Sequence, residues 1–360
     1  MVMRKRSKFF LFAIGFAVAA LFVLKLFQAP LGQWVFDRAV TQRVGKDATA
    51  SLTDGLHIGL CGTGSPLPSA ERAGACNVVI AGKRVFVVDA GEGGARNIQL
   101  MGIAAGRIER VFLTHFHSDH IDGMGPMMLF RWTGSSAKSP LPVHGPVGVG
   151  TVIAGFNAAY ALDNGYRVAH HGVNIVPPEG AGAVAVPFDL TTDSAVIFED
   201  GGVKVTAFKV DHDPVKPSVG YRFDYKGRSV VISGDTAKSP VLIAAAKGAD
   251  LLVHEALQPK MVAAMTKGLE AKGLKTTARI TRDILDYHAS PEEAAETAKA
   301  AGVQQLVLSH IVPAVPSSFF YPAFLGHAAK RFSGPIVVGE DGMLFSLPAG
   351  SKDINKRDLL

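Results

Sequence analysis

Four side chains that bind divalent metals lie within six positions of one another. They are His115, His117, Asp119 and His120 in the segment THFHSDHIDGM, which follows an apolar strand predicted at 110–114. Imidazole nitrogen and carboxylate oxygen are both zinc ligands, and one short loop can bring them together. A lone histidine is more often a core residue, but this grouping predicts a metal site.

Further candidate residues each follow a predicted strand downstream of that loop. They are His212, Asp235, Glu255 and His310, after strands expected at 203–210, 229–233, 251–254 and 305–309. Taken singly, each could be a core, surface or turn residue. In α/β sheets, however, the loops at the carboxyl ends of strands bring distant residues together. We therefore expect chemistry at these strand ends.

The elements that must position these residues form one α/β domain, expected from residue 56 to 347. Short β-branched runs alternate there with turns and helical stretches. Ser290 and Pro291 predict a helix start, which would extend to about Ala301. The segment 262–287 has helical apolar spacing; a structural role is favoured over a lid. Residues 348–360 are expected to be a frayed polar tail.

The first thirty residues differ from the rest, because four basic residues (Arg4, Lys5, Arg6 and Lys8) precede an apolar run at 9–24. This pattern predicts a signal anchor at 1–30, which would be a transmembrane helix, and a connector at 31–55. Cleavage as a secretory signal is the alternative. The basic flank would keep the N-terminus cytoplasmic, so the catalytic domain would be periplasmic in a bacterium, held at the inner membrane.

Net charge gives no support for a polyanionic partner. The formal charge is +6, but five of these charges lie in the anchor segment, which has no acidic residues. The remaining domain is nearly neutral, whereas nucleic-acid binding draws much of its affinity from phosphate neutralisation. Charge therefore argues against nucleic acid.

The chain has two cysteines, Cys61 and Cys76. In an oxidising compartment they could form a disulfide across a short loop, contributing about 3 kcal/mol in the chain-entropy model. Two buried free thiols are the alternative.

The loop at 115–120 resembles the HxHxDH motif of the metallo-β-lactamase superfamily. The resemblance extends over residues 56–347 and implies a four-layer αββα sandwich with mixed β-sheets. It also implies that His115, His117 and His212 hold one metal, that Asp119, His120 and His310 hold a second, and that Asp235 bridges them. Asp89 matches an aspartate that orients a ligand imidazole.

Within the superfamily, the chain resembles the branch of arylsulfatases and transfer-RNA 3′ processing enzymes (ribonuclease Z). The shared motifs are GTGSPLP, GYR, SGDT, HEA and HAS. In that branch, a histidine matching His288 would protonate the leaving oxygen, oriented by a glutamate matching Glu255. Asp119 is counted with these two as catalytic. Two zinc ions would share a water, lower its pKa and so supply hydroxide; manganese or iron could replace zinc.

The substrate expected from these observations is a small anionic ester, a sulfate or phosphate ester, as in the arylsulfatase-like members. The transfer-RNA enzymes carry a long arm between the GYR and SGDT strands, and here only residues 223–232 lie there. Ribonuclease Z-type cleavage and a lactonase are the alternative enzymes, and an inactive metal-binding scaffold is the alternative that is not an enzyme. The resemblance also allows a homodimer.

Overall fold

Strands buried along their whole length dominate the chain from Ala48 onward. β1 (Gly55–Gly62), β2 (Cys76–Ala81), β11 (Leu251–Leu257) and β12 (Gln305–Val312) are buried at every position. Such burial is expected where a sheet is covered on both faces. The computed structural model describes residues 3–360, which divide into two units, the residues up to Asp47 and Ala48–Leu360.

The second unit contains two mixed sheets. The eight-stranded sheet has the order β15 (Asn355–Asp358), β14 (Met343–Pro348), β1, β2, β3 (Arg84–Val88), β4 (Ile108–Phe112), β5 (Leu141–Pro146) and β6 (Ala183–Phe188). The seven-stranded sheet has the order β13 (Ile336–Val338), β12, β11, β10 (Arg228–Ile232), β9 (Val219–Tyr225), β8 (Val203–Lys209) and β7 (Ser194–Asp200). In each sheet, one half is antiparallel and the other half is parallel.

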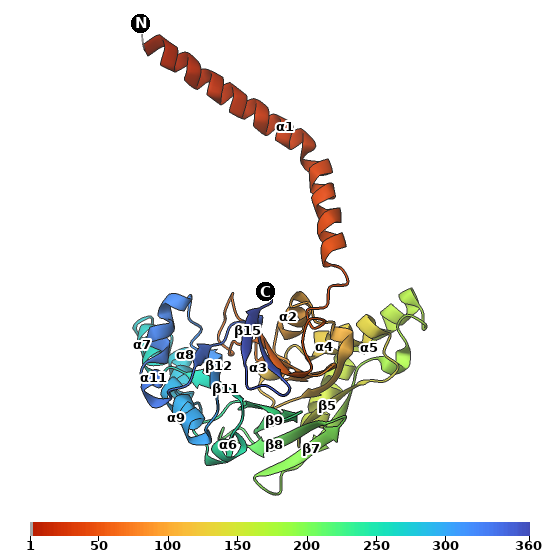
Figure 1. Ribbon diagram of the computed structural model, residues 1–360, viewed down its shortest axis with the longest axis vertical. Helices are drawn as coiled ribbons and strands as arrows, with labels where there is room; N and C mark the ends of the chain where they lie inside the picture. The colour runs from red at the N-terminus through yellow and green to blue at the C-terminus, as the bar shows by residue number, and fades with distance from the viewer. Residues whose placement is uncertain (1–2) are drawn as a thin grey trace. The chain divides into compact units, whose positions relative to one another are not determined.

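Three apolar cores lie between the layers of this unit. One core lies between the sheets and includes Phe86, Phe112 and Phe223. A second joins the eight-stranded sheet to α2, α4 and α5, and a third joins the seven-stranded sheet to α6, α9, α10 and α11. Figure 1 shows α4 and α5 on one outer side and α9 and α11 on the other. The order of layers is therefore helices, sheet, sheet, helices, as expected.

The helices of this unit vary widely in length. Their bounds are α2 (Gly94–Leu100), α3 (Ser118–Ile121), α4 (Met124–Ser135), α5 (Val149–His171), α6 (Pro240–Ala245), α7 (Pro259–Ala271), α8 (Lys275–Asp283), α9 (Pro291–Ala301), α10 (Tyr321–Leu325) and α11 (Ala328–Arg331). Short 3-10 turns lie at Ala105–Arg107, Pro178–Gly180 and Ser318–Phe320.

The first unit is one long helix, α1 (Met3–Arg43), which is bent in Figure 1. It continues past residue 30, so much of the predicted connector is helical. Pro30 lies inside it, and an interior proline removes one backbone hydrogen bond and bends a helix. The stretch Phe12–Gln42 is long and apolar enough to cross a membrane, but a signal sequence would pass the same test. Membrane attachment therefore stays a prediction.

Two segments of the second unit differ from expectation. The C-terminal tail is not frayed at 355–358, because β15 pairs with β14, and Arg357 donates hydrogen bonds to Ser51 Oγ and to the Ala48 carbonyl. Helix α5 is not among the predicted helices, although Val149, Ile153, Phe156 and Tyr160 have helical spacing along it and pack against the second core. Exposed apolar residues such as Leu162 and Tyr166 blur that pattern in the sequence. The predicted strands at 203–210, 229–233, 251–254 and 305–309 correspond to β8, β10, β11 and β12.

Candidate metal centre

The loop after β4 delivers the four clustered candidates to one edge of the sheets. Thr114 anchors it, because its backbone N–H donates to Asp89 Oδ1 over 2.8 Å and its carbonyl accepts from the Val219 N–H over 3.0 Å. His115, Asp119 and His120 are buried, while His117 is half-buried. His212 and Asp235 reach the same edge three residues after the ends of β8 and β10. Glu255 and His310 lie within β11 and β12, close to the ends of these strands.

One group of metal-binding atoms joins His115, His117, His212 and Asp235. His115 Nε2 lies 3.0 Å from His117 Nδ1, and His212 Nε2 lies 3.5 Å from the same nitrogen. Asp235 Oδ2 is 3.9 Å from Nε2 of both His115 and His212. Ligand atoms about 2.0–2.1 Å from a tetrahedral zinc ion are roughly 3.3 Å apart. The observed spacing fits such an ion.

A second group joins Asp119, His120 and His310 and shares the same Asp235 oxygen. Asp119 Oδ2 lies 3.1 Å from His310 Nε2 and 3.6 Å from His120 Nε2. Asp235 Oδ2 lies 3.4 Å from His120 Nε2 and 3.3 Å from His310 Nε2. A single carboxylate oxygen is therefore a neighbour of both groups.

Hydrogen bonds at the back of the rings leave ligand nitrogens free to face these groups. His120 Nδ1 donates to Asp89 Oδ2 over 2.9 Å, and His212 Nδ1 donates to the Tyr287 carbonyl over 3.0 Å. Each bond fixes a tautomer in which Nε2 carries a lone pair. Among the described residues, buried His120 Nε2 and Asp235 Oδ1 have no hydrogen-bond partner. Orphaned acceptors of this kind are costly unless a cation binds them.

The Asp235 carboxylate, which neighbours both groups, is favoured in its charged form. Burial favours the neutral acid, but positive charge at the positions of His310 and His120 outweighs burial and holds the pKa of Asp235 well below its usual range, and a bound cation would act in the same direction. The donor set of imidazoles and carboxylates fits a divalent metal such as zinc.

His288 and Glu255 lie beside this cluster as a hydrogen-bonded pair. His288 Nδ1 donates to Glu255 Oε1 over 2.9 Å, and the same oxygen accepts the N–H groups of Thr236 and Ala289, each over 3.1 Å. The His288 ring stacks on that of His310 with centroids 5.5 Å apart. The helix start predicted at Ser290 is present: Ser290 and Glu293 form a capping box just after His288.

The electrostatic surroundings keep His288 protonated at neutral pH. Burial disfavours the imidazolium, but the Glu255 carboxylate outweighs burial and, with Asp235 and Asp119, raises the pKa of His288 to about 9. A protonated imidazole held by a carboxylate can donate a proton to a leaving oxygen.

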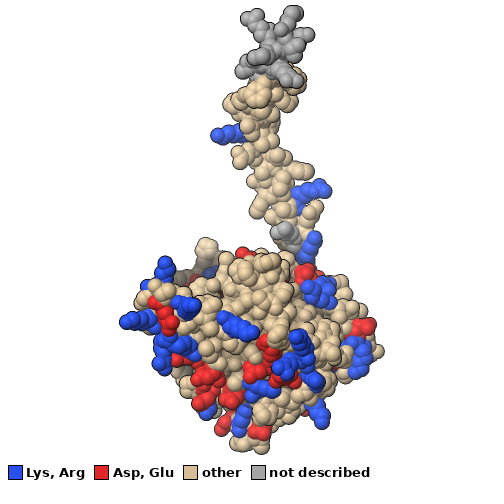
Figure 2. All heavy atoms as spheres, turned by 90° about the vertical axis from the view of Figure 1, so that its left-hand side faces the viewer, with Lys and Arg blue, Asp and Glu red and all other residues tan. Residues whose placement is uncertain are grey.

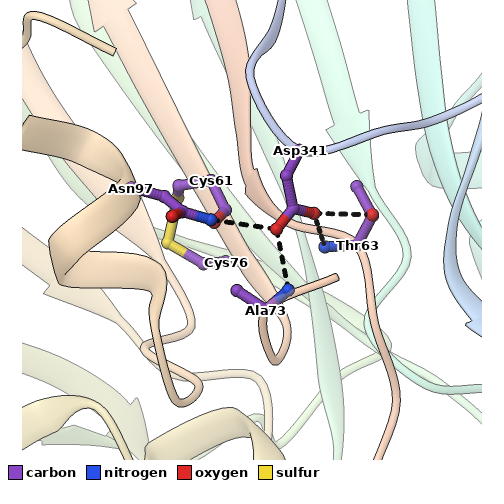
Figure 3. The surroundings of a disulfide bond; sticks show 6 residues. All are labelled: Cys61, Thr63, Ala73, Cys76, Asn97 and Asp341. Atoms are coloured by element: carbon purple, nitrogen blue, oxygen red, sulfur yellow. Dashed lines mark hydrogen bonds between the residues drawn. A yellow bond between two sulfur atoms is a disulfide. The ribbon is translucent and has the colours of Figure 1, made fainter. Parts of the chain in front are cut away.

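The two cysteines form a disulfide that supports the loop beside the last ligand (Figure 3). Near it, Asp341 accepts hydrogen bonds from Thr63 N, Thr63 Oγ1, Ala73 N and Asn97 Nδ2 at 2.7–2.9 Å. The Thr63 carbonyl in turn accepts from the N–H of Ile311, the residue after His310. The cysteines therefore form a disulfide rather than remaining free thiols. Through Thr63, the loop that the disulfide closes is hydrogen-bonded to the residue after His310.

Tyr287 and Thr114 support the site but were not singled out from the sequence. Tyr287 orients His212 through its carbonyl, and its ring lies 4.8 Å from both the His212 and His288 rings. Thr114 Oγ1 contacts Asp89 Oδ2 at 2.9 Å and His115 Nδ1 at 3.1 Å. Adjacency to His288 and His115 was the only sequence signal for either.

Comparisons with known proteins agree with this geometry. A family model described as "Beta-lactamase superfamily domain" matches residues 84–311. Ribonuclease Z of Mycobacterium avium is 37% identical over 288 residues, covering 79% of this chain and 96% of that protein. Ribonuclease Z of Mycolicibacterium gilvum is 38% identical, again over 79% of this chain, and 94% of that protein is covered.

Two solved structures share the fold. The metallo-β-lactamase fold protein YhfI from Bacillus subtilis has a TM-score of 0.58 at 19% identity, and the match covers 81% of this chain and 99% of that one. The short form of human tRNase Z has a TM-score of 0.57 at 24% identity, with the same coverage.

These relatives contradict the expected partner and change which of the candidate activities is better supported. The expected partner was a small anionic ester rather than nucleic acid, and this is wrong, because the similar proteins are named for ribonuclease activity. The connection from β9 to β10 is only the turn at Lys226 and Gly227. It excludes a long RNA-binding arm at this place, but it does not exclude RNA binding by another surface. Likewise, near-neutral net charge does not exclude a local basic surface. The alternative of ribonuclease Z-type activity is better supported than sulfate-ester hydrolysis.

The fold, the cluster of histidines and aspartates, and the extent of these similarities lead to one conclusion. The chain is a metal-dependent hydrolase that belongs to the metallo-β-lactamase superfamily, in its ribonuclease Z-like branch.

Proposed function

We propose that this protein is a ribonuclease Z-type enzyme that hydrolyses a phosphodiester bond of RNA. The observation that carries the proposal is Asp235 Oδ2, which neighbours both groups of metal-binding atoms while the His288–Glu255 pair lies alongside. The ribonuclease Z relatives, which match over 79% of this chain, support RNA as the substrate class.

The site residues divide into two roles in this proposal. His115, His117 and His212 would hold one divalent ion, Asp119, His120 and His310 a second, and Asp235 would bridge them. Bound there, the ions would polarise the phosphate and lower the pKa of the attacking water. His288 would protonate the leaving ribose oxygen, and Glu255 would keep its ring in place and charged. Asp89 would hold the tautomer of His120.

The α7–α8 hairpin supplies the local basic surface that RNA requires. Residues 259–286 carry six basic side chains against three acidic ones. Arg279 pairs with Asp283, and Arg282 pairs with Glu270. The remaining basic side chains are exposed and have no ion pair with any described residue: Lys260, Lys267, Lys272 and Lys275.

The hairpin lies next to the metal centre. Val262 of α7 packs with Leu257 at the end of β11 and with Val312, which lies two residues after His310. His288 lies five residues after Asp283, the last residue of α8. Figure 2 looks onto the side of the domain that carries these helices in Figure 1, where Lys and Arg side chains alternate with acidic ones. RNA phosphates reaching His288 would meet the hairpin lysines.

The disulfide supports the predicted location. Disulfides persist in oxidising compartments, and the buried Cys61–Cys76 bond suits a catalytic unit outside the cytoplasm. We propose that location together with attachment through α1. A reporter whose activity requires oxidation, fused after Leu360, should be active in cells; an inactive reporter on an intact fusion would place the unit in the cytoplasm.

Activity is best tested on the full chain, purified in detergent with its metals counted. The substrates would be a precursor transfer RNA, an unstructured RNA, bis(p-nitrophenyl) phosphate and p-nitrophenyl sulfate. We expect RNA cleavage that a chelator abolishes and added zinc restores. His288→Ala should lower kcat about 10²- to 10⁴-fold with the metal content retained. The exposed His327→Ala is the matched control.

The possible results separate the candidate activities. RNA and diester cleavage that depends on His288 would establish the proposal. Hydrolysis of the sulfate alone would overturn it, as would two bound metals with no RNA cleavage.

A further inference from the structure

A cavity of about 430 Å³ lies beside the metal centre and has no part in the mechanism above. It is formed where β5, β6 and β8 end and where β9 begins, so it opens at the strand ends that also carry the histidines. Its lining includes Val147, Phe188, Leu190, Lys209, Lys216 and Ser218.

Two segments connect this cavity to the metal-binding residues. Lining residues at 209–210 and 216–219 flank His212 in the loop between β8 and β9. On the other side, the ring of Phe116, between His115 and His117, packs closely on Gly148: a Cβ added at Gly148 would come within 2.8 Å of that ring. Gly148 directly follows the lining residue Val147. A group bound in the cavity would thus lie next to a phosphate held at the metals.

The lining has the character of a site for a flat, partly polar group. Leu190 is buried, Phe188 is half-buried, and Val147 is 57% exposed at the cavity. Ser218 is 6% exposed, and its buried Oγ has no hydrogen-bond partner among the described residues. An aliphatic group would leave that hydroxyl unsatisfied, whereas the edge of a nucleobase offers both donors and acceptors. Lys209 supplies positive charge for an adjoining phosphate, whereas Lys216 pairs with Asp213 over 2.5 Å and the carboxylate of Asp189 also lines the cavity.

We infer that this cavity holds the base of one of the two nucleotides that flank the scissile phosphate. The inference rests on the proposed function, because it assumes an RNA substrate. The base would pack against Phe188 and Leu190, and Ser218 Oγ would hydrogen-bond its edge. The cavity would then favour a nucleotide over an abasic sugar at that position.

The test compares short RNAs that differ at one nucleotide. One is intact, one is abasic 5′ of the scissile bond, and one is abasic 3′ of it. The full-length protein would be assayed beside Val147→Trp, which fills the cavity mouth, and Ser218→Ala. Val173→Trp is the matched control, because Val173 is 58% exposed and lies outside the cavity lining.

For the native protein, kcat/KM should fall about tenfold or more on one of the two abasic RNAs, since stacking of one base commonly contributes that much. Val147→Trp should lose this discrimination, Ser218→Ala should weaken it, and Val173→Trp should keep it. Equal cleavage of all three RNAs, or full discrimination in Val147→Trp, would overturn the inference alone. No RNA cleavage by the native protein would overturn the proposed function too.

Discussion

At the scale of single residues, the site depends on side chains that hold other side chains in place. Asp89 has a φ of 60°, an unusual conformation for a residue other than glycine, and both of its oxygens are used. One accepts the Thr114 N–H, and the other accepts His120 Nδ1–H. The strained backbone of Asp89 therefore places the carboxylate that orients the His120 ring.

Replacing Asp89 tests this role. In Asp89→Asn, the uncharged amide holds the His120 tautomer less firmly, so metal affinity should fall about 10- to 100-fold. Competition of a chelator for bound zinc measures this directly. Asp122→Asn is the control, since Asp122 lies in the same loop but outside both groups of metal-binding atoms. An unchanged zinc affinity in Asp89→Asn would remove Asp89 from the site.

Glu255 sets the pH range over which His288 can donate a proton. With the Glu255 carboxylate present, the pKa of His288 is raised to about 9, so His288 stays protonated through neutral pH. Glu255→Gln removes the charge, and the pKa should fall. The alkaline limb of the pH–kcat profile should move to lower pH, while activity at acidic pH changes less. A limb that stays in place would mean that another group is the acid.

At the scale of elements, the α7–α8 hairpin is the expected RNA-binding surface. Changing Lys260, Lys267, Lys272 and Lys275 together to Gln should raise KM for RNA. It should also reduce the salt dependence of KM, by up to about 0.7 in log–log slope for each RNA phosphate that a lysine no longer neutralises. Measuring KM at several salt concentrations gives the slope.

A second variant with the same change in net charge controls for long-range electrostatics. It changes four exposed lysines elsewhere to Gln: Lys138, Lys247, Lys330 and Lys352. Its KM and salt slope should stay close to those of the native protein. If both variants behave alike, the hairpin has no special role.

Features encoded by neighbouring residues could be predicted from the sequence, whereas features that depend on contacts between distant segments could not. The HxHxDH loop could be predicted because its ligands are adjacent, and most central strands could be predicted from their apolar runs. His212, Asp235 and His310 were ambiguous singly and became ligand candidates only through resemblance. The Tyr287 carbonyl and the buried Ser218 hydroxyl acquire their roles from tertiary contacts, which leave no trace in spacing. In helix α5, the exposed Leu162 and Tyr166 obscure the apolar stripe that packs on the core.

At the scale of the whole molecule, the disulfide connects the edge of the metal centre to the core of the second unit. Cys61 and Cys76 are buried, and they join the end of β1 to the start of β2. The loop they close carries Thr63 and Ala73, which Asp341 binds. The loop closed by the disulfide therefore contributes both to the stability of the second unit and to the position of His310.

Cys61→Ser with Cys76→Ser should lower the free energy of unfolding by about 3 kcal/mol. Urea denaturation followed by fluorescence of the buried Trp132 reports on this unit. Native protein unfolded, reduced and alkylated before refolding should show the same decrease. An unchanged midpoint in the double variant would show that the noncovalent contacts suffice.

The turn at Lys226 and Gly227 joins the ends of β9 and β10 that are remote from Asp235, because β10 runs from Arg228 toward the site. Both residues have positive φ and are exposed. A peptide tag or fluorescent protein spliced in at this turn would leave the pairing of the two strands intact. The hydrolase could then be tethered to a sensor chip by this end, with its catalytic edge facing the solution.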